Sequence, residues 1–344
     1  MIPSAAAARH FESWRRELAE AVTDPAELLD LLQLDPALLP AARRAAARFG
    51  LKVPRGFVAR MRAGDPHDPL LLQVLPLGAE LEAHAGFGPD PVGDLAALAA
   101  PGVLAKYRGR ALLMTTGACA VHCRYCFRRE FPYEAGALTP ARLAEAVSAL
   151  AATPGLEEVI LSGGDPLALP TARLLQVSDA LRALPGLRRL RIHTRTPVVL
   201  PARVNAALLD WIGGLPWKTV VVLHVNHPRE LSGEVVEAAA ALAARGATLL
   251  NQSVLLAGVN DDEDTLAELS TRLFEAGVLP YYLHLLDRVA GAAHFDTPAQ
   301  RAAELHAGLL QRLPGYLVPR VVREAPGAGS KLPAGVAGHP LDGC

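Results

Sequence analysis

Short apolar runs alternate with amphipathic segments from about residue 104 to residue 312. Six of these runs have the length of buried strands, and they cover residues 111–116, 157–163, 187–194, 218–225, 247–256 and 279–286. The segments between them, such as PARLAEAVSALAAT and GEVVEAAAALAARG, carry apolar residues at helical spacing. Strand then helix, repeated about six times, predicts an α/β protein whose parallel strands are joined by right-handed crossovers. This pattern fits an incomplete barrel and a doubly wound sheet equally well.

Two flanking regions show other patterns. Helical spacing in AELLDLLQL and PALLPAARRAAARFG gives way to Pro- and Gly-rich stretches such as GDPHDP and GFGPDPVGD. We therefore predict an N-terminal helical region and connector over 1–100, a core over 101–312, and a C-terminal segment over 313–344. This last segment is predicted to be loop-rich.

Composition and charge argue against several classes of protein. Hydrophobic residues make up 51% of the 344 residues, enough for a sizeable core, and the formal net charge of −1 offers no general attraction to nucleic acid or membranes. The sequence has no uncharged apolar stretch of about 18 residues, so we predict no transmembrane helix. The N-terminus does not resemble a secretory signal. Three of the four cysteines fall within eight residues, which favours a metal site over a disulfide framework. We therefore expect a cytoplasmic protein.

Polar residues stand at the ends of four of the apolar runs, in HTRT, HVNHP, NQS and HLLD. In barrels of parallel strands, the C-terminal ends of the strands carry the chemistry. The sequence therefore predicts a functional site at this edge of the sheet.

The clustered cysteines form the motif C-x3-C-x2-C, with Cys119, Cys123 and Cys126 just after the first core strand. Thiolates hold iron–sulfur clusters and zinc, and three thiolates on a four-iron cluster leave one iron open. The alternative is a structural zinc site completed by His122 or Cys344. Structural zinc usually combines ligand pairs from two segments, and the sequence has no second pair.

The cysteine motif resembles that of the radical S-adenosylmethionine (SAM) superfamily, in which the open iron binds the amino and carboxylate groups of SAM. Tyr125 supplies the aromatic residue typical of the position before the last cysteine. The run Ser162, Gly163, Gly164, Asp165 resembles the glycine-rich segment that binds the SAM amino group, although an ordinary βα turn has the same composition. Weaker candidates for SAM contact, each of which could instead cap a strand end, are Arg195, His224 and Gln252.

Further segments resemble the lysine 2,3-aminomutases of this superfamily. They include KYRGRALL, CRYCFRREF, RIHTRTPVVLPARV, HVNHPRE, NQSVLLAGVND, YYLHLLDRVAGAAHF and APGAGSK, in the family's order over nearly the whole chain. The resemblance is to the EpmB branch in particular, which makes (R)-β-lysine for modification of elongation factor P. It implies an incomplete (β/α)6 radical SAM barrel with an N-terminal helical region and a C-terminal tail that binds pyridoxal 5′-phosphate (PLP). The implied cofactors are a [4Fe–4S] cluster, SAM and PLP.

The resemblance also implies roles for individual residues. Lys331 matches the lysine that attaches PLP, Arg128 the residue that pairs with the substrate carboxylate, and Asp287 a carboxylate facing the substrate ε-ammonium. Residues that match positions around the PLP phosphate are Lys106, Tyr107 and Arg110. From the residues alone, GAGSK could also be a flexible basic tail. It does not have the spacing of a P-loop. Likewise, Arg128 could solvate a loop and Asp287 could cap a strand.

Two departures from the family pattern concern the C-terminal segment. Glu324 stands seven residues before Lys331, where aminomutases acting on free lysine usually have Asp. Only 13 residues follow Lys331, with Cys344 as their single cysteine, whereas many free-lysine enzymes have a longer zinc-binding tail. The short tail favours the EpmB branch.

The implied function is an isomerase that converts L-α-lysine to (R)-β-lysine for the modification of elongation factor P. An external electron donor would supply the enzyme with electrons. The second hypothesis is a general lysine 2,3-aminomutase that supplies β-lysine to metabolism, and the third is a non-catalytic metal-binding barrel. The resemblance leaves open the oligomeric state, a homo-oligomer included, and direct contact with elongation factor P.

Overall fold

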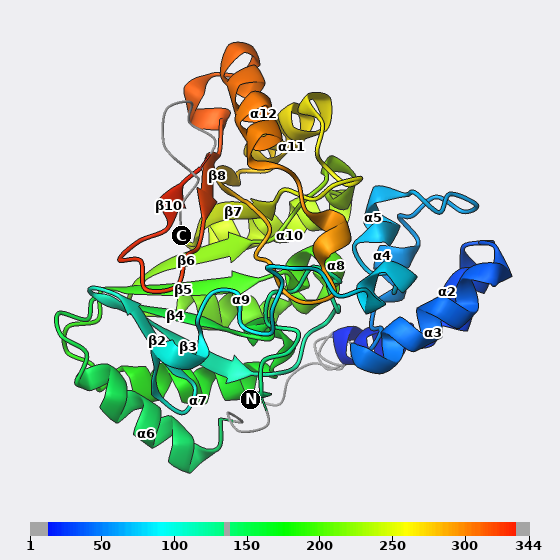
Figure 1. Cartoon of the computed structure of the whole chain (residues 1–344). Helices are drawn as coiled ribbons and strands as arrows, with labels where there is room; N and C mark the ends of the chain where they lie inside the picture. Colours follow the sequence, from blue (N-terminus) through cyan, green and yellow to red (C-terminus); the bar gives the residue numbers. More distant parts are fainter. Residues whose placement is uncertain (1–12, 134–137, 335–344) are drawn as a thin grey trace.

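The fold is that of a computed structural model, which describes residues 13–133 and 138–334. In this part of the chain, ten strands form one mixed sheet in chain order (Figure 1). They are β1 Leu98–Ala100, β2 Val103–Tyr107, β3 Arg110–Thr116, β4 Glu158–Gly163, β5 Arg189–Thr194, β6 Lys218–Leu223, β7 Thr248–Val254, β8 Leu279–His284, β9 Arg320–Arg323 and β10 Leu332–Pro333. Neighbours from β3 to β9 are parallel, and the outer pairs are antiparallel. The six predicted strands are confirmed as β3 to β8, and so is the α/β class.

The seventh parallel strand, β9, lies in the segment that the sequence predicted to be loop-rich, so that prediction is wrong for residues 320–323. Its two valines between arginines form too short a run to stand out. Paired with β8, however, Val321 and Val322 are only 3% and 4% exposed. The chain then returns as β10, which pairs Leu332 with Arg323. This hairpin carries Lys331 to the sheet.

Helices pack along one face of the sheet, with α6 and α7 beneath β2 to β4 in Figure 1. They are α6 Pro140–Ala151, α7 Thr171–Leu181, α8 Thr196–Val199, α9 Ala206–Gly213, α10 Gly233–Ala244, α11 Glu263–Glu275 and α12 Ala299–Arg312. Local signals set their starts. In α6, for example, Pro140 occupies the first turn and the Thr139 hydroxyl accepts a hydrogen bond from the Arg142 backbone N–H.

Strand alternation separates the core from the functional face. In β5, Leu190 and Ile192 belong to the buried core between the sheet and the helices. Arg191 and His193, in contrast, line a cavity on the opposite face of the sheet. The adjoining strand β6 follows the same rule. Because successive side chains of a strand point to opposite faces, one set of strands builds both the core and the cavity wall.

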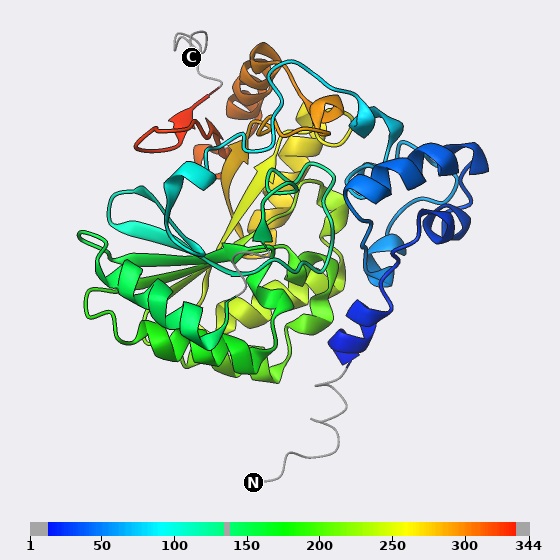
Figure 2. The ribbon, with the colours of Figure 1, turned by 60° about the horizontal axis from the view of Figure 1, so that its bottom comes forward.

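The N-terminal part contains α2 Pro25–Leu31, α3 Leu39–Arg48, α4 Arg55–Val58 and α5 Pro69–Leu72, which flank the sheet on one side (Figure 2). Its apolar core also includes Ala120 and Val121, from between the clustered cysteines. Short 3-10 turns complete the fold: η1 Pro36–Leu38, η2 Gly78–Leu81, η3 Leu95–Ala97, η5 Pro166–Ala168, η6 Pro201–Arg203, η7 Pro228–Glu230, η8 Ala293–Phe295 and η9 Gly315–Leu317. Among the helices that the structure describes, none is long and apolar enough to cross a membrane.

Candidate active site

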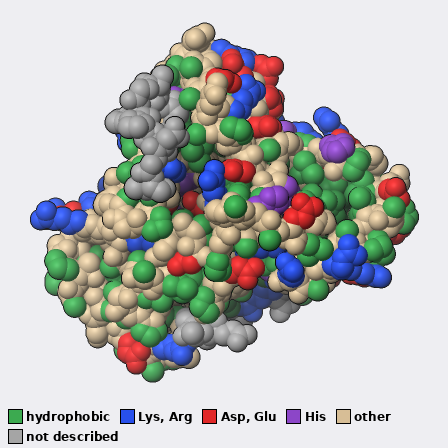
Figure 3. Space-filling model, viewed as in Figure 1, with side chains coloured by type: hydrophobic (Ala, Val, Ile, Leu, Met, Phe, Trp, Pro, Cys, Tyr) green, Lys and Arg blue, Asp and Glu red, His purple; other side chains and the backbone are tan. Residues whose placement is uncertain are grey.

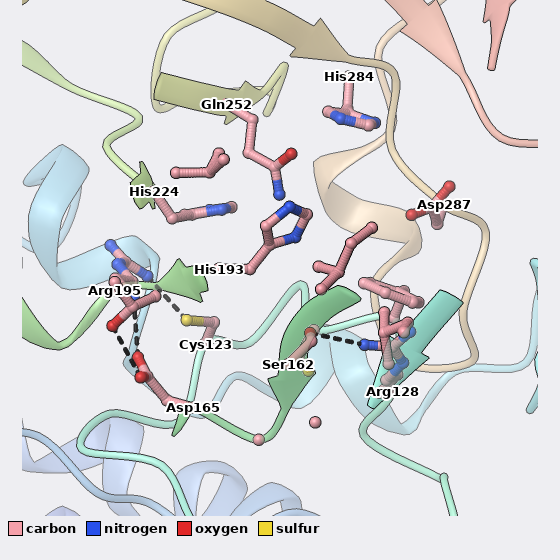
Figure 4. Close-up of a pocket in the computed structure, with 18 of the residues that line it drawn as sticks. Cys123, Arg128, Ser162, Asp165, His193, Arg195, His224, Gln252, His284 and Asp287 are labelled. Atoms are coloured by element: carbon pink, nitrogen blue, oxygen red, sulfur yellow. Dashed lines mark hydrogen bonds between the residues drawn. The ribbon is translucent and has the colours of Figure 1, made fainter. Parts of the chain in front are cut away.

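A cavity of about 560 Å³ lies over the face of the sheet opposite the helices and reaches the C-terminal ends of the parallel strands. All the site residues proposed from the sequence line it: Lys106, Tyr107, Arg110, Cys119, Cys123, Cys126, Arg128, Ser162, Gly163, Gly164, Asp165, Arg195, His224, Gln252, Asp287 and Lys331. Figure 4 shows Cys123 and Arg195 on one side of this space and Arg128 and Asp287 on the other. Charged and histidine side chains gather near the centre of the face seen in Figure 3.

The cysteines lie on a loop, residues 117–126, that follows β3 and is fixed by the N-terminal region. The His122 N–H donates to the Lys52 carbonyl at 2.9 Å. Arg124 is completely buried and donates to both oxygens of Glu80, at 2.8 and 2.6 Å. The helical region therefore holds the cysteine loop in place by a buried ion pair as well as by apolar packing.

Gly163 and Gly164 let the start of this loop lie directly on the end of β4. A Cβ on Gly163 would come within 2.4 Å of the Thr116 carbonyl oxygen, and one on Gly164 within 2.4 Å of the Ala118 carbonyl oxygen. Gly163 also has a φ of +120°, which side chains disfavour. The sequence predicted close approach by a ligand here, whereas the closest neighbour in the structure is the backbone of the cysteine loop.

The three thiols have the surroundings expected of cluster ligands. Burial, followed by the neighbouring Cys126, raises the pKa of Cys119. Burial, followed by Cys123, raises the pKa of Cys126 to about 11. Partly buried thiols that oppose one another's ionisation become thiolates more readily when a cation such as iron is present.

The zinc alternative lacks its expected fourth ligand among the described residues. His122 Nδ1 lies 2.8 Å from the Gly50 carbonyl oxygen, and Cys344 lies outside the residues that the structure describes. Over 13–133 and 138–334, no three His, Cys, Asp or Glu side chains are grouped to hold a metal ion. The preference for a multi-iron cluster over a single zinc ion therefore rests on the spacing of the three cysteines.

Arg195 connects the cysteine loop to a buried polar network. Its Nη1 donates to Cys123 Sγ at 2.8 Å and to the Tyr125 hydroxyl at 2.7 Å. Its Nη2 donates to Gln73 Oε1 at 2.6 Å and to Glu230 Oε2 at 2.9 Å. Most of the donors of Arg195 are thus used within the protein, where they join the cysteine loop to Gln73 and Glu230.

Asp165 joins the ends of β4 and β5 through four hydrogen bonds. Oδ1 accepts from the Leu167 N–H at 2.9 Å and the Thr194 hydroxyl at 2.7 Å. Oδ2 accepts from the N–H groups of Arg195 and Thr196 at 2.7 and 2.9 Å. The carboxylate is therefore occupied by the protein, although its residue lines the cavity.

Three histidines give the cavity a neutral, hydrogen-bonding wall. His224 Nε2 lies 2.9 Å from the Tyr125 hydroxyl, and burial lowers the pKa of His224 to about 3. Burial also lowers the pKa values of His193 and His284. The Nε2 atoms of these two side chains are buried without a partner in the described residues, which costs about 1–3 kcal/mol each unless a ligand supplies one. Gln252 projects into the same space (Figure 4).

Lys331 is held in place beside the sheet, unlike a flexible basic tail. Its Nζ lies 3.1 Å from Glu324 Oε2. Lys106 Nζ lies 2.8 Å from Glu324 Oε1, 2.5 Å from Asp94 Oδ1 and 2.8 Å from the Val92 carbonyl oxygen. Although burial opposes it, these lysines hold the pKa of Glu324 below its ordinary value. The ammonium group of Lys106, which the resemblance implies to be near the PLP phosphate, is therefore already surrounded by protein oxygens.

Arg110 is the cation in this part of the cavity that remains available. Its guanidinium lies 4.6 Å from the centre of the Tyr107 ring. Within the described chain it has neither an ion pair nor a side-chain hydrogen bond. Burial, followed by Glu324, raises the pKa of Tyr107, so its hydroxyl stays protonated.

Arg128 and Asp287 present a guanidinium and a carboxyl group to the cavity. Arg128, 8% exposed, donates from Nε to Asp94 Oδ2 at 2.6 Å and from Nη1 to Ser162 Oγ at 3.3 Å. Among the described residues, Asp287 has no ion-pair partner within 4 Å. Burial, followed by Glu324, raises its pKa to about 7.

Sequence reasoning missed several residues that organise the site. His193 and His284 stood in the polar HTRT and HLLD runs, so their positions were visible from the pattern. No sequence signal marked the buried residues that position the functional cations: Gln73, Glu80, Asp94 and Glu230.

Comparison with known proteins agrees with this geometry. The radical SAM superfamily matches residues 113–269. The chain is 47% identical to the L-lysine 2,3-aminomutase of Escherichia coli K12 over 94% of both chains. It is 42% identical to that of Haemophilus influenzae over 96% of this chain and 98% of the relative.

A more distant relative is the L-lysine 2,3-aminomutase of Acetoanaerobium sticklandii, which is 32% identical over 94% of this chain and 78% of its own. Among solved structures, a radical SAM methyltransferase from Sphaerobacter thermophilus matches with 19% identity and a TM-score of 0.46, over 64% of this chain and 68% of its own. Identity of 40% and more over nearly the whole chain confirms the resemblance seen in the motifs. The protein belongs to the L-lysine 2,3-aminomutase family of radical SAM enzymes, which are isomerases that use a [4Fe–4S] cluster and SAM.

Proposed function

We propose that the protein converts L-α-lysine to (R)-β-lysine with the help of a [4Fe–4S] cluster, SAM and PLP, and that the product serves the modification of elongation factor P. The observation that carries this proposal is the shared cavity. Three cysteine thiols without a disulfide partner, Lys331, Arg128 and Asp287 line one space of about 560 Å³, so two cofactors and an amino acid would meet there.

The cysteine side of the cavity would hold the cluster and SAM. Cys119, Cys123 and Cys126 would each bind one iron, leaving a fourth iron for SAM. Residues that border the adjoining space are Ser162, Gly163, Gly164, His224 and Gln252. Arg195 and Asp165 keep this wall in position through their bonds within the protein.

The β9–β10 side would hold PLP, with Lys331 as the attachment point and Arg110 as the cation for the phosphate. When bound, the cluster and SAM supply a hydrogen-abstracting radical, and PLP carries the migrating amino group. Tyr107 keeps its proton, so it adds no negative charge beside the phosphate.

Arg128 and Asp287 would hold lysine by its two charged ends. The guanidinium fork of Arg128 is already oriented by Asp94 and Ser162, and it suits a planar carboxylate. Within 13–133 and 138–334, Asp287 has no competing cation within ion-pair distance, and it would receive the ε-ammonium. Fixing both ends would place the middle of the substrate between the two cofactors. Transfer of the amino group between neighbouring carbons requires such close and oriented contact.

The role in modifying elongation factor P rests on the resemblance to the EpmB branch. A strain lacking this gene, grown without β-lysine, tests it through the mass of its elongation factor P. We expect the β-lysyl increment to disappear and to return when (R)-β-lysine is added. An unchanged mass would favour the general metabolic role instead.

Borohydride trapping tests the assignment of the cavity. The sequence has four lysines, Lys52, Lys106, Lys218 and Lys331, so peptide mapping can locate reduced PLP unambiguously. We expect PLP on Lys331, loss of trapping in Lys331→Ala and normal trapping in the control Lys218→Ala. PLP attached to another lysine would overturn the proposal.

A further inference from the structure

A chain of alternating charges runs along one side of the cavity. Lys331 pairs with Glu324 at 3.1 Å, and Glu324 pairs with Lys106 at 2.8 Å. Lys106 in turn pairs with Asp94 at 2.5 Å, and Asp94 pairs with Arg128 at 2.6 Å. Every contact is shorter than 3.2 Å, so the residue assigned to PLP and the residue assigned to the substrate carboxylate are joined by continuous ion pairs.

The centre of this chain is well shielded from water. The Asp94 side chain is 2% exposed, and the side chains of Lys106 and Glu324 are 16% and 17% exposed. Ion pairs in such surroundings interact more strongly than exposed ones, and removing one partner leaves a buried charge uncompensated. The contacts therefore constrain one another.

We propose that Lys106 and Asp94 are positioning residues that keep Arg128 oriented toward the substrate carboxylate, with its charge only partly neutralised, rather than ligands of the PLP phosphate. This inference rests on the proposed function, because it takes Arg128 as the carboxylate site. Asp94 orients the fork by accepting from Nε, which leaves the outer edge of Arg128 toward the cavity. Lys106 shares the negative charge of Asp94, so Arg128 is not fully neutralised by its partner.

The cation arrangement separates this role from phosphate binding. Lys106 Nζ already has three oxygen neighbours, in Asp94, Glu324 and Val92. Arg110, by contrast, has neither an ion pair nor a side-chain hydrogen bond in the described chain. A phosphate would thus be held by Arg110, and the loss of Lys106 would be felt at Arg128.

Two affinity ratios distinguish the roles in the anaerobically reconstituted full-length protein. The ratio of PLP to pyridoxal affinity reports the phosphate contact, and the ratio of L-lysine to L-lysinamide affinity reports the carboxylate contact. In Lys106→Met we expect the second ratio to fall about tenfold and the first to stay near the wild-type value. In Arg110→Met we expect the reverse, with the first ratio falling by about one to two decades. Lys106→Arg should restore the second ratio.

If the single variant folds poorly, the double variant Lys106→Met/Glu324→Gln provides the same test, because it removes one positive and one negative charge together. A fall in the PLP to pyridoxal ratio of either Lys106→Met protein, comparable to that of Arg110→Met, would overturn the inference and leave the proposed function intact. An unchanged lysine to lysinamide ratio would also overturn it. Wild-type protein that does not attach PLP to Lys331 would instead overturn the proposed function.

Discussion

The Nη1 of Arg195 lies 2.8 Å from the Sγ of Cys123, so a buried guanidinium donates directly to a thiol of the cysteine motif. The same guanidinium pairs with Glu230 at 2.9 Å. The contact joins the cysteine loop to β5 and places a fixed positive charge beside the proposed cluster. Such a charge stabilises the reduced, more negative form of a cluster.

Arg195→Met should therefore lower the reduction potential of the reconstituted cluster by about 60 mV or more, the one-electron equivalent of a tenfold change. Anaerobic spectroelectrochemical titration measures this directly. Since the single variant leaves buried Glu230 unpaired, at a cost of about 3–5 kcal/mol, Arg195→Met/Glu230→Gln is the matched control for folding. An unchanged potential in both proteins would show that the guanidinium does not act on the cluster.

Replacing Cys119, Cys123 or Cys126 by Ala should prevent stable assembly of the cluster, because each thiolate is assigned to one iron. Iron analysis and absorbance after anaerobic reconstitution provide the measurement. Cys344→Ala, outside both the motif and the described residues, should keep its iron content. Full iron and activity in any of the first three variants would refute the ligand assignment.

Gly164→Ala should disturb the cluster without removing any ligand. The added Cβ would come within 2.4 Å of the Ala118 carbonyl oxygen, so the start of the cysteine loop must shift. We expect lower iron retention and lower activity, whereas Gly233→Ala, whose Cβ would meet no atom within 4 Å, should behave as wild type. Normal iron retention and activity in Gly164→Ala would mean that the loop tolerates displacement.

Asp287 predicts a pH dependence for lysine binding. Burial, followed by Glu324, raises its pKa to about 7, so it is mostly neutral at pH 6 and mostly charged at pH 8. The substrate ε-ammonium, with a pKa of about 10.4, stays charged throughout. KM for lysine should therefore fall from pH 6 to pH 8 in the wild type and lose this component in Asp287→Asn. In Asp287→Asn, turnover of lysine should also fall much more than turnover of an analogue lacking the ε-ammonium. Equal losses for the two substrates would show that Asp287 is a structural residue.

The same pKa predicts a stability effect of known sign. Because the folded-state pKa lies above the ordinary value of 3.8, the folded state binds the proton more tightly than the unfolded state, and stability falls as the pH rises from about 4 to about 7. Ligand-free Asp287→Asn should be more stable than wild type at pH 8 by about 1 kcal/mol or more, since each pKa unit corresponds to about 1.4 kcal/mol. The difference should shrink toward pH 4. Thermal unfolding at the two pH values measures it.

Arg128→Lys should be defective although the charge is kept. A lysine ammonium cannot reproduce the planar fork that contacts Asp94 and Ser162 while facing a carboxylate. Loss of a charge-assisted contact costs about 1.5–3 kcal/mol, or roughly one to two decades in substrate affinity. Arg182→Lys, at an exposed surface pair, is the control, and wild-type lysine affinity in Arg128→Lys would contradict the assignment.

The sequence was most informative where chemistry and position coincide. The cysteine motif, Lys331 and the polar ends of the apolar runs identified residues that share one cavity, although they are far apart in the chain. The parallel arrangement of the strands explains this for the strand ends and the cysteine loop, because their C-terminal ends meet at one edge of the sheet, and the β9–β10 hairpin brings Lys331 to the same cavity.

The sequence was least informative about residues whose roles depend on packing. Glu230 meets Arg195 from 35 residues away and Gln73 meets it from 122 residues away, and no local pattern encodes such pairings. Lys106 matches a family position beside the PLP phosphate, and nothing in the local sequence shows that Asp94 and Glu324 contact it. Strand β9 was missed because four residues carry too little periodicity to reveal a strand that gains its burial from β8.

The most direct test of the central claim is anaerobic turnover of lysine labelled with ¹⁵N at the α-nitrogen, using reconstituted protein, SAM, PLP and a reductant. The account predicts (R)-β-lysine with the label on C3, formed by the wild type and lost in Lys331→Ala and in Cys126→Ala. Chiral chromatography with mass spectrometry gives product, enantiomer and label position together. Cleavage of SAM without labelled β-lysine in protein that holds both its cluster and PLP would contradict the account.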